Sequence, residues 1–210
     1  MSGDLGETFW DERYRGQAAL WSGRPNRYLV SEAAGLAPGR ALDAGSGEGA
    51  DAIWLAELGW QVTAVDFSAV ALERAAGHAR QRGGDVAARI EWVREDLTEW
   101  DPGPGRYDLV TAQYLHLPSA GRPAFFRRLA AAVAPGGSLL VVGHHASDLQ
   151  TTIPRPQDPD RYFTSHEIVS VLEPGVWDVV TDAAPERSAT DPEGRAVTVR
   201  EVVFRAQRRP

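Results

Sequence analysis

The sequence predicts an α/β fold in which helices cover both faces of a mostly parallel sheet. Between Arg40 and Val142, apolar runs typical of strands alternate with stretches of helical periodicity. The last of these runs, at 138–142, is almost continuously apolar, as strands buried on both faces are. The 210 residues, 43% of them hydrophobic, suffice for one domain with a sizeable core.

Within this single domain we expect an N-terminal helical arm at 1–38, a core at 39–145 and a C-terminal part at 146–210. The arm has one helix at 7–15 and a second that Asn26 caps and that ends near Gly35. The expected core elements are a strand at 40–44, a helix at 50–58, a strand at 62–65, a helix that Ser68 caps and that ends near 81, strands at 89–94 and 107–112, a helix at 123–133, a turn at 134–137 and a strand at 138–142.

The character of the chain changes after Val142. Residues 164–167 form a capping box, which predicts a helix that ends near Leu172. Two strands follow at 177–182 and 197–205 with no helix between them, and Asp-Pro-Glu-Gly at 191–194 suits a hairpin-like turn. The sheet is therefore expected to end in an antiparallel pair.

Composition excludes several classes of function. The net charge of −7 offers no basic surface to nucleic acid, and the absence of cysteine excludes disulfides and thiolate metal sites. No apolar run approaches the ~20 residues of a membrane span. The N-terminal residues lack the pattern of a signal peptide, so we expect a cytoplasmic protein with no membrane partner.

A glycine-rich turn follows the first core strand. Gly45, Gly47 and Gly49 alternate with other residues, and Asp43 stands two positions ahead. Glycine lets a ligand approach the backbone closely, and the N–H groups of the helix start then face it. Alone, this spacing is equally typical of a tight strand–helix turn.

Polar residues at successive strand ends strengthen the ligand interpretation, because the carboxyl ends of parallel strands meet at one edge. Asp66, directly after the second strand, is placed to accept both hydroxyls of a ribose. Phe67 can pack on an adenine ring, Asp96 can accept a hydrogen bond from its amino group, and Leu97 can cover it. Taken alone, each of these carboxylates can equally be a helix cap or a loop residue with no ligand.

Five motifs in order resemble the class I S-adenosylmethionine-dependent methyltransferases: DAGSGEG at 43–49, VTAVDF at 62–67, EDL at 95–97, YDLV at 107–110 and L-x4-APGG at 129–137. The resemblance implies a Rossmann-like three-layer sandwich with a seven-stranded sheet whose last strand is antiparallel. It also implies S-adenosylmethionine as the cofactor and S-adenosylhomocysteine as the product. The expected cofactor-binding residues are Trp10, Tyr14, Trp21, Asp43, Gly45, Ser46, Gly47, Asp66, Phe67, Asp96, Leu97 and Gln113.

A finer resemblance concerns the two ends of the chain. Residues 10–26 are similar to the aromatic arm of thiopurine methyltransferases, and 162–167 with 191–195 resemble the tellurite-resistance methyltransferases. Those families methylate soft atoms, which implies a small-molecule acceptor such as a thiol. A thiol with a pKa near ~8.5 hardly needs a base, whereas an aliphatic hydroxyl does.

Four side chains are candidates for the acceptor side of the site. His144 and His145 follow the last parallel strand and are candidate catalytic bases; as neighbours in an extended segment they point opposite ways. Tyr114, His116 and His145 are candidates to contact the acceptor. The residues after the fourth strand, 111–114, lack the acidic ligands of metal-dependent relatives, so we expect no metal.

Alternatives remain open. The acceptor atom can be oxygen or nitrogen, and a nicotinamide-dependent oxidoreductase shares a similar sheet, although the chain has no lysine for a Tyr/Lys hydride site. A binding module without activity and a protein or RNA methyltransferase are the other rivals. We expect a monomer or a homodimer.

Overall fold

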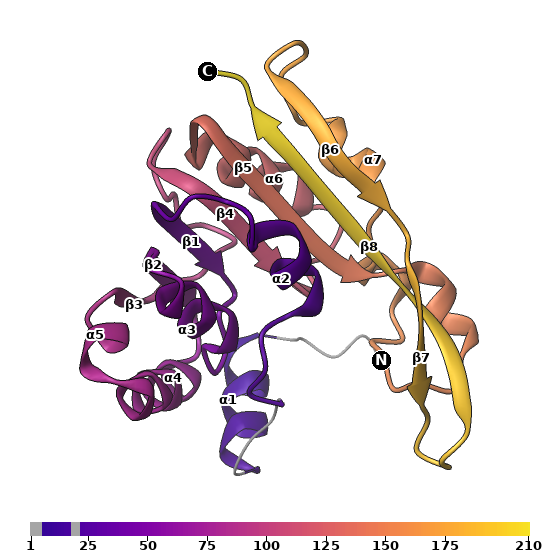
Figure 1. Ribbon diagram of the computed structural model, residues 1–210. Coiled ribbons are helices and arrows are strands. Elements are labelled where there is room, and N and C mark those ends of the chain that lie inside the picture. The colour runs from indigo at the N-terminus through magenta and orange to yellow at the C-terminus, as the bar shows by residue number, and fades with distance from the viewer. Residues whose placement is uncertain (1–5, 18–21) are drawn as a thin grey trace.

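A computed structural model describes residues 6–17 and 22–210 (Figure 1). Trp21, an expected cofactor contact, lies outside the described residues. The helices are α1 (Glu7–Arg15), α2 (Arg27–Ala33), α3 (Ala50–Glu57), α4 (Ala69–Arg82), α5 (Gly84–Ala87), α6 (Arg122–Ala132), α7 (Ser165–Val169) and the 3-10 turns η1 (Ala146–Gln150) and η2 (Pro159–Arg161). The strands are β1 (Arg40–Ala44), β2 (Gln61–Asp66), β3 (Ile90–Arg94), β4 (Tyr107–Gln113), β5 (Val133–His144), β6 (Trp177–Ala183), β7 (Glu186–Thr190) and β8 (Ala196–Arg208).

One sheet runs through the molecule in the order β3-β2-β1-β4-β5-β8-β6. The first five strands in this order pair in parallel, and β8 runs antiparallel to both β5 and β6. Strand order reverses between β1 and β4, which is where α/β sheets bind ligands. The α/β class and the antiparallel end are thus confirmed.

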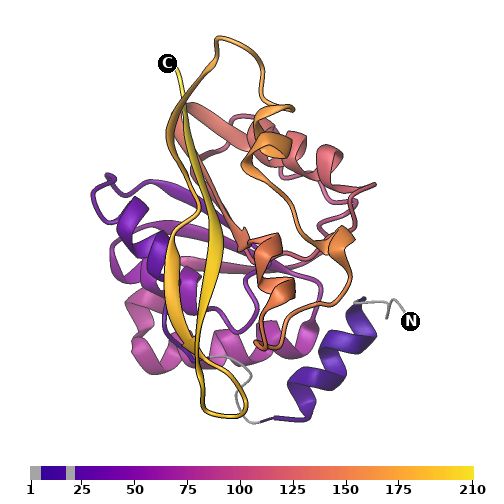
Figure 2. The same ribbon diagram turned by 90° about the vertical axis from the view of Figure 1, so that its right-hand side faces the viewer.

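The described residues form eight strands, one more than expected. β8 has 13 residues, and its long span pairs with β7 along 196–200 and with β6 along 203–208. The turn at 191–194 therefore closes a β7–β8 hairpin, which extends beyond the main sheet (Figures 1 and 2). This arm brings Arg187 toward the cleft described below.

The almost continuous apolar run of β5 serves two cores. Leu139 and Val141 pack with α6 and α7 on one face of the sheet, whereas Leu140 and Val142 pack with α2 and α3 on the other. Successive strand residues point to opposite faces, so a strand covered on both sides has to be apolar throughout. The three-layer arrangement follows from this pattern.

Local caps form where the sequence predicts them. The Asn26 side chain accepts from the N–H groups of Tyr28 and Leu29, and Ser68 accepts from Ala71 N–H. The capping box of Thr164 and Glu167 is present at α7. The expected turn at 134–137 is wrong: this stretch belongs to β5, which begins at position 133 with an irregular register against β4.

Helix α1 is fastened over the carboxyl ends of β2 and β3. Its buried Asp11 accepts a hydrogen bond from the Ser68 hydroxyl, and its Glu7 pairs with Arg94 at the end of β3. The N-terminal arm thus covers one side of the ligand-binding edge. Among the described helices, none combines the length and apolar character needed to span a membrane.

A substitution at Gly49 tests how closely the glycine turn packs against β3 and α4. Gly49 has φ +84°, and a Cβ there would lie 2.6 Å from the Trp92 ring and 2.8 Å from the Ala75 methyl. We expect Gly49→Ala to lower the free energy of unfolding by about 2–4 kcal/mol, the sum of a left-handed backbone and overpacking. Urea denaturation measures this. The control is Gly84→Ala, whose Cβ meets nothing within 4 Å; an equal loss in both variants would contradict the packing argument.

Candidate active site

A cleft of about 1870 Å³ lies at the carboxyl ends of the parallel strands. It exceeds the ~300–1,000 Å³ of a typical single-ligand pocket, so it has room for two ligands. We distinguish a nucleoside half from an acceptor half. The nucleoside half comprises α1, the glycine turn 45–49, Asp51, 66–67 and 94–98, and the acceptor half comprises 113–118, His144, Arg155, Arg161 and Arg187.

The glycine turn is held against β2 by its own backbone. Gly45 and Ser46 N–H donate to Val65 O at 2.8 and 3.0 Å. Gly45, Gly47 and Gly49 all have positive φ, and a Cβ on Gly45 would lie 2.4 Å from the Leu115 side chain. Only glycine lets the turn reach the segment after β4 this closely. Gly45, Ser46 and Gly47 all line the cleft.

Asp66 joins the glycine turn to helix α4. Its Oδ2 accepts from Gly47 N–H and its Oδ1 from Ser68 N–H, each at 2.9 Å. Burial raises the pKa of Asp66, and these two hydrogen bonds oppose the rise. Each carboxylate oxygen has a second lone-pair site, so Asp66 on the cleft wall retains acceptors for the two hydroxyls of a ribose.

Asp43 takes a different position from the expected one. It is buried, accepts a hydrogen bond from Ala52 N–H and is not among the residues that line the cleft. Burial, Asp51 and Asp66 raise its pKa. Asp51, unlike Asp43, lines the cleft, and its Oδ1 accepts from Asn26 N–H at 2.6 Å. A direct contact of Asp43 with the cofactor therefore does not follow from the structure.

The remaining expected residues of the nucleoside half lie together. Trp10 and Tyr14 of α1 line the cleft with ring centroids 6.2 Å apart, and Phe67 and Leu97 line it from the ends of β2 and β3. Asp96 also lines it, although its Oδ1 accepts from the Thr98 N–H and hydroxyl. This arrangement suits a flat aromatic ring between apolar surfaces with an acceptor at its edge.

Three buried polar atoms near the β1–β4 junction have no hydrogen-bond partner within the described residues. They are Asp43 Oδ2, Ser46 Oγ and Gln113 Oε1. Buried polar atoms are nearly always satisfied in folded proteins, and Ser46 and Gln113 line the cleft. The residues present therefore fit a polar ligand, such as the amino-acid part of S-adenosylmethionine, at this junction.

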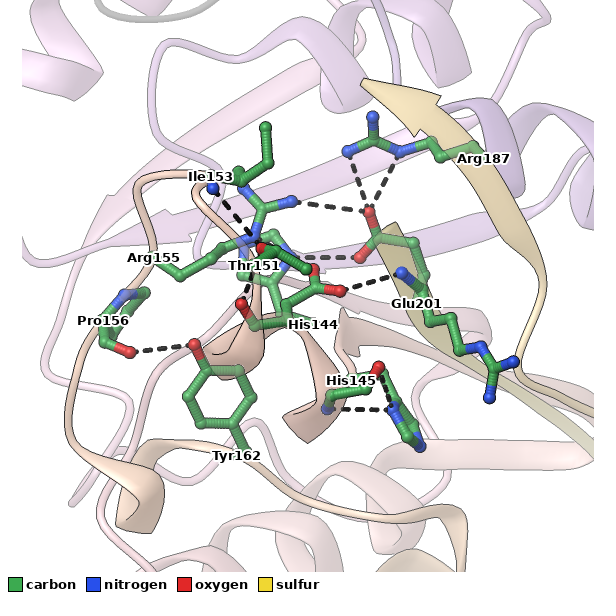
Figure 3. Close-up of polar contacts among 12 residues, drawn as sticks. His144, His145, Thr151, Ile153, Arg155, Pro156, Tyr162, Arg187 and Glu201 are labelled. Atoms are coloured by element: carbon green, nitrogen blue, oxygen red, sulfur yellow. Dashed lines mark hydrogen bonds and ion pairs between the residues drawn. The ribbon is translucent and has the colours of Figure 1, made fainter. Parts of the chain in front are cut away.

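The acceptor half centres on His144 at the end of β5 (Figure 3). His144 Nδ1 lies 3.0 Å from Oε2 of Glu201, its register partner on β8. Its ring stacks on Tyr114 at 4.4 Å and on His116 at 5.2 Å between centroids. Tyr114 has φ +53°, an unusual backbone for a non-glycine residue that turns the chain after β4 into the cleft.

Both imidazoles are held neutral. Burial lowers the pKa of His144, the Arg155 charge adds to the fall and the Glu201 carboxylate opposes it. Burial and the neighbouring His144 lower the pKa of His116 to about 3. Because Glu201 accepts from Nδ1–H, the lone pair of His144 resides on Nε2. A neutral imidazole with this tautomer can take a proton from an acceptor.

His145 points away from the cleft. Its Nδ1 accepts from Ser147 N–H at 3.2 Å and lies 2.9 Å from Ser147 Oγ, so the ring caps η1. The prediction that the two histidines diverge is confirmed, and the expected catalytic and acceptor contacts of His145 do not follow from its position. Tyr114, His116 and His144 all line the cleft.

Residues 41–137 match the family model described as a methyltransferase domain. Residues 41–137 therefore carry a methyltransferase domain, and the fold that surrounds them is the Rossmann-like methyltransferase fold. A ubiquinone biosynthesis O-methyltransferase of Caulobacter sp. (strain K31) is 35% identical over 49% of this chain and 39% of its own length. The chain thus spans less than half of that relative. The 2-heptyl-1-hydroxyquinolin-4(1H)-one methyltransferase of Mycobacteroides abscessus is 27% identical over 92% of this chain and 86% of its own.

Solved structures share the fold of this methyltransferase domain. One, from work on the conversion of a disulfide bond into a thioacetal group during echinomycin biosynthesis, has a TM-score of 0.74 and 23% identity, covering 97% of this chain and 91% of its own. TehB from Haemophilus influenzae has a TM-score of 0.69 and 18% identity, covering 97% and 67%. The recognition of a class I methyltransferase is confirmed, and TehB is among the structures that share its fold.

Sequence reasoning missed the charged residues that surround His144. Glu201, Arg187 and Arg155 come from β8, β7 and the loop after η1. A glutamate directly before the apolar run at 202–204 is a signal that could have been noticed. Its partner depends on the β5–β8 register, which no local pattern reveals. Within 6–17 and 22–210, no group of three His, Asp or Glu is arranged to hold a metal ion.

Asp51 makes stability depend on pH. Burial raises the pKa of Asp51 to about 6. The free energy of unfolding therefore falls as the pH rises from about 4 to 6, because the folded protein ionises Asp51 less readily than the unfolded chain does. Above pH 6 the loss stays constant. Asp51→Asn removes this cost and keeps an acceptor for Asn26 N–H. We expect the free energy of unfolding of the variant to exceed that of the wild type by ~1–2 kcal/mol at pH 8 and to differ little from it at pH 4.

Urea denaturation at the two pH values measures the effect. The exposed Asp182→Asn of β6 controls for the loss of one negative charge. A stability gain for Asp51→Asn that is equal at pH 4 and pH 8 would show that Asp51 does not titrate in this range.

Proposed function

We propose that this domain transfers a methyl group from S-adenosylmethionine to a heteroatom of a small molecule. The observation that carries the proposal is the shared cleft: Asp66 with the glycine turn lies in one half, and the neutral His144 lies in the other. S-adenosylmethionine with its nucleoside bound in the nucleoside half would place its sulfur near the junction with the acceptor half.

S-adenosylmethionine supplies an electrophilic methyl carbon on a sulfonium. The chain supplies alignment, which can be worth roughly 7–11 kcal/mol of barrier. Asp66 binds the ribose, Ser46 and Gln113 bind the amino-acid part, and α1 with Phe67 and Leu97 excludes water from the adenine. Tyr114 and His116 shape the space from which the acceptor atom approaches.

A thiol sulfur is the acceptor atom that we propose first. Its support is the resemblance of both chain ends to families that act on soft atoms, and a fold shared with the protein of echinomycin biosynthesis. An ionised thiol reaches the methyl carbon without assistance from a base. Acceptor molecules that bind as the neutral thiol still carry a proton, and His144 then accepts it.

A phenolic or N-hydroxyl oxygen is the second candidate. The His144–Glu201 pair favours it, because a hydroxyl has to lose its proton as the new bond forms. The proton passes to His144 Nε2, and Glu201 stabilises the imidazolium through Nδ1–H. The relatives from Caulobacter and Mycobacteroides abscessus, by their names, support such an acceptor.

The wider expectations from the sequence stay predictions. They are a single domain divided near residues 38 and 145, a monomer or homodimer, a cytoplasmic location, no catalytic metal and no nucleic-acid partner. A nicotinamide-dependent oxidoreductase remains the rival from another class, and cofactor titration separates the two.

Calorimetric titration tests the cofactor. We expect micromolar binding of S-adenosylhomocysteine and none of NAD. Asp66→Ala should weaken S-adenosylhomocysteine at least tenfold, because the ribose loses its acceptor and the glycine turn loses the bond to Gly47. Asp182→Ala, an exposed carboxylate on β6, should bind as the wild type does. Binding of NAD alone would support the oxidoreductase.

Two acceptors of the same shape test the base. With phenol as the acceptor we expect His144→Gln to lower kcat/KM by 10²–10⁴, the usual contribution of a general base. With thiophenol the loss should stay below tenfold. S-adenosylhomocysteine release measures both rates. His145→Gln, next in sequence but outside the cleft, is the matched control; equal losses in the two variants would remove His144 from the chemistry.

A further inference from the structure

The two halves of the cleft differ in charge. Acidic side chains dominate the lining of the nucleoside half, which includes Asp51, Asp66 and Asp96. The charged residues that line the acceptor half are Arg155, Arg161 and Arg187, with no Asp or Glu among its described lining residues. A ligand in the acceptor half therefore meets cations.

The counter-charges of Arg155 and Arg187 lie off the cleft wall. Glu201 and Asp148 have 0 and 1% of their surface exposed and are not lining residues. Arg187 donates to Glu201 Oε1 through Nε and Nη2 at 3.1 and 3.0 Å, and Arg155 Nε donates to Asp148 Oδ2 at 3.3 Å. Figure 3 shows the Arg155 and Arg187 guanidiniums approaching Glu201 from two sides. Fixed carboxylates thus hold the guanidiniums in position.

Arg155 retains donor capacity. Its side chain is 13% exposed, and its Nη2 is 3.9 Å from Glu201 Oε1, too far for a hydrogen bond. No acceptor within the described residues satisfies this buried atom. Burying an unsatisfied charged donor is costly, and a ligand oxygen would remove that cost. The planar guanidinium group presents N–H donors in a geometry that matches the two oxygens of a carboxylate.

The arginines act on the same groups that contact the acceptor. Arg155 lowers the pKa of His144, and Arg155 with Arg161 lowers that of His116. Arg161 also donates to His116 O at 2.8 Å, which ties it to the segment after β4. The charge of Arg155 therefore acts on both rings beside which the acceptor atom would lie, and there it favours an anion over a neutral molecule.

We propose that the methyl acceptor is a small organic acid whose carboxylate binds the Arg155 side of the acceptor half while its thiol or hydroxyl faces His144. This inference rests on the proposed function and adds the substrate class. The acidic group supplies the binding energy and orientation, and the cationic wall selects against neutral analogues of the same shape.

Matched probes test this proposal in the full chain saturated with S-adenosylhomocysteine. Calorimetry compares 3-mercaptobenzoate and 4-mercaptobenzoate with the corresponding mercaptobenzamides, which keep the shape and lose the charge. We expect the acids to bind at least tenfold more tightly, with a preference that falls as salt rises. Equal binding of acids and amides, including undetectable binding of both, would overturn the proposal.

Variants locate the charge. Arg155→Met should abolish the preference for the acids and Arg155→Lys should retain part of it. Arg82→Gln, a change of a lining arginine outside the acceptor half, should leave the preference intact. Arg187→Gln provides a second test if loss of Arg155 prevents folding, because Arg187 lies on the β7–β8 arm. An undiminished preference in folded Arg155→Met and Arg187→Gln would refute the assignment.

The outcome is separable from the proposed function. If the wild type binds S-adenosylhomocysteine and methylates thiophenol but shows no preference for the acids, the methyltransferase activity stands and the acid specificity fails. If S-adenosylhomocysteine itself does not bind, the proposed function fails, and titration of the acids and amides into the protein alone still decides the charge preference.

Discussion

The acceptor half of the cleft depends on the neutralisation of Glu201. This carboxylate has no exposed surface, and an unpaired charge in such a place would cost several kcal/mol. Its partners come from different elements: His144 from β5, Arg187 from β7 and Arg155 from the loop after η1. Because all must converge on one side chain, the pairing places the β7–β8 arm and the loop against the end of the parallel sheet.

The nucleoside half solves a different electrostatic problem. Asp43, Asp51 and Asp66 lie near one another, and the hydrogen bonds that hold them come from backbone N–H groups. Burial raises the pKa of each. Backbone dipoles stabilise a carboxylate without a full counter-charge, so this half favours a ligand that brings positive charge. S-adenosylmethionine carries it on the sulfonium and on the amino group.

Local sequence patterns predicted what local forces determine. The caps at Asn26 and Ser68 and the glycine turn depend on residues close in sequence, and they form as expected. The His144–Glu201 pair depends on the register of β5 against β8, whose residues are 57 positions apart at that contact. The role of Asp43 stays a prediction: its spacing from the glycines is as expected, but only the packed structure shows that it is buried and absent from the cleft lining.

The arginines and the base reinforce one another. A histidine beside a carboxylate would ordinarily gain a proton more readily, and a protonated His144 could not accept another. Burial and Arg155 outweigh Glu201, so His144 stays neutral while the hydrogen bond still selects its tautomer. In the function proposed above, the Arg155 charge that helps to keep His144 neutral would also stabilise the anion that the acceptor becomes when it loses its proton. Under that proposal a single charge arrangement serves both proton removal and acceptor binding, which accounts for the three arginines in the half of the cleft that does not face the cationic cofactor.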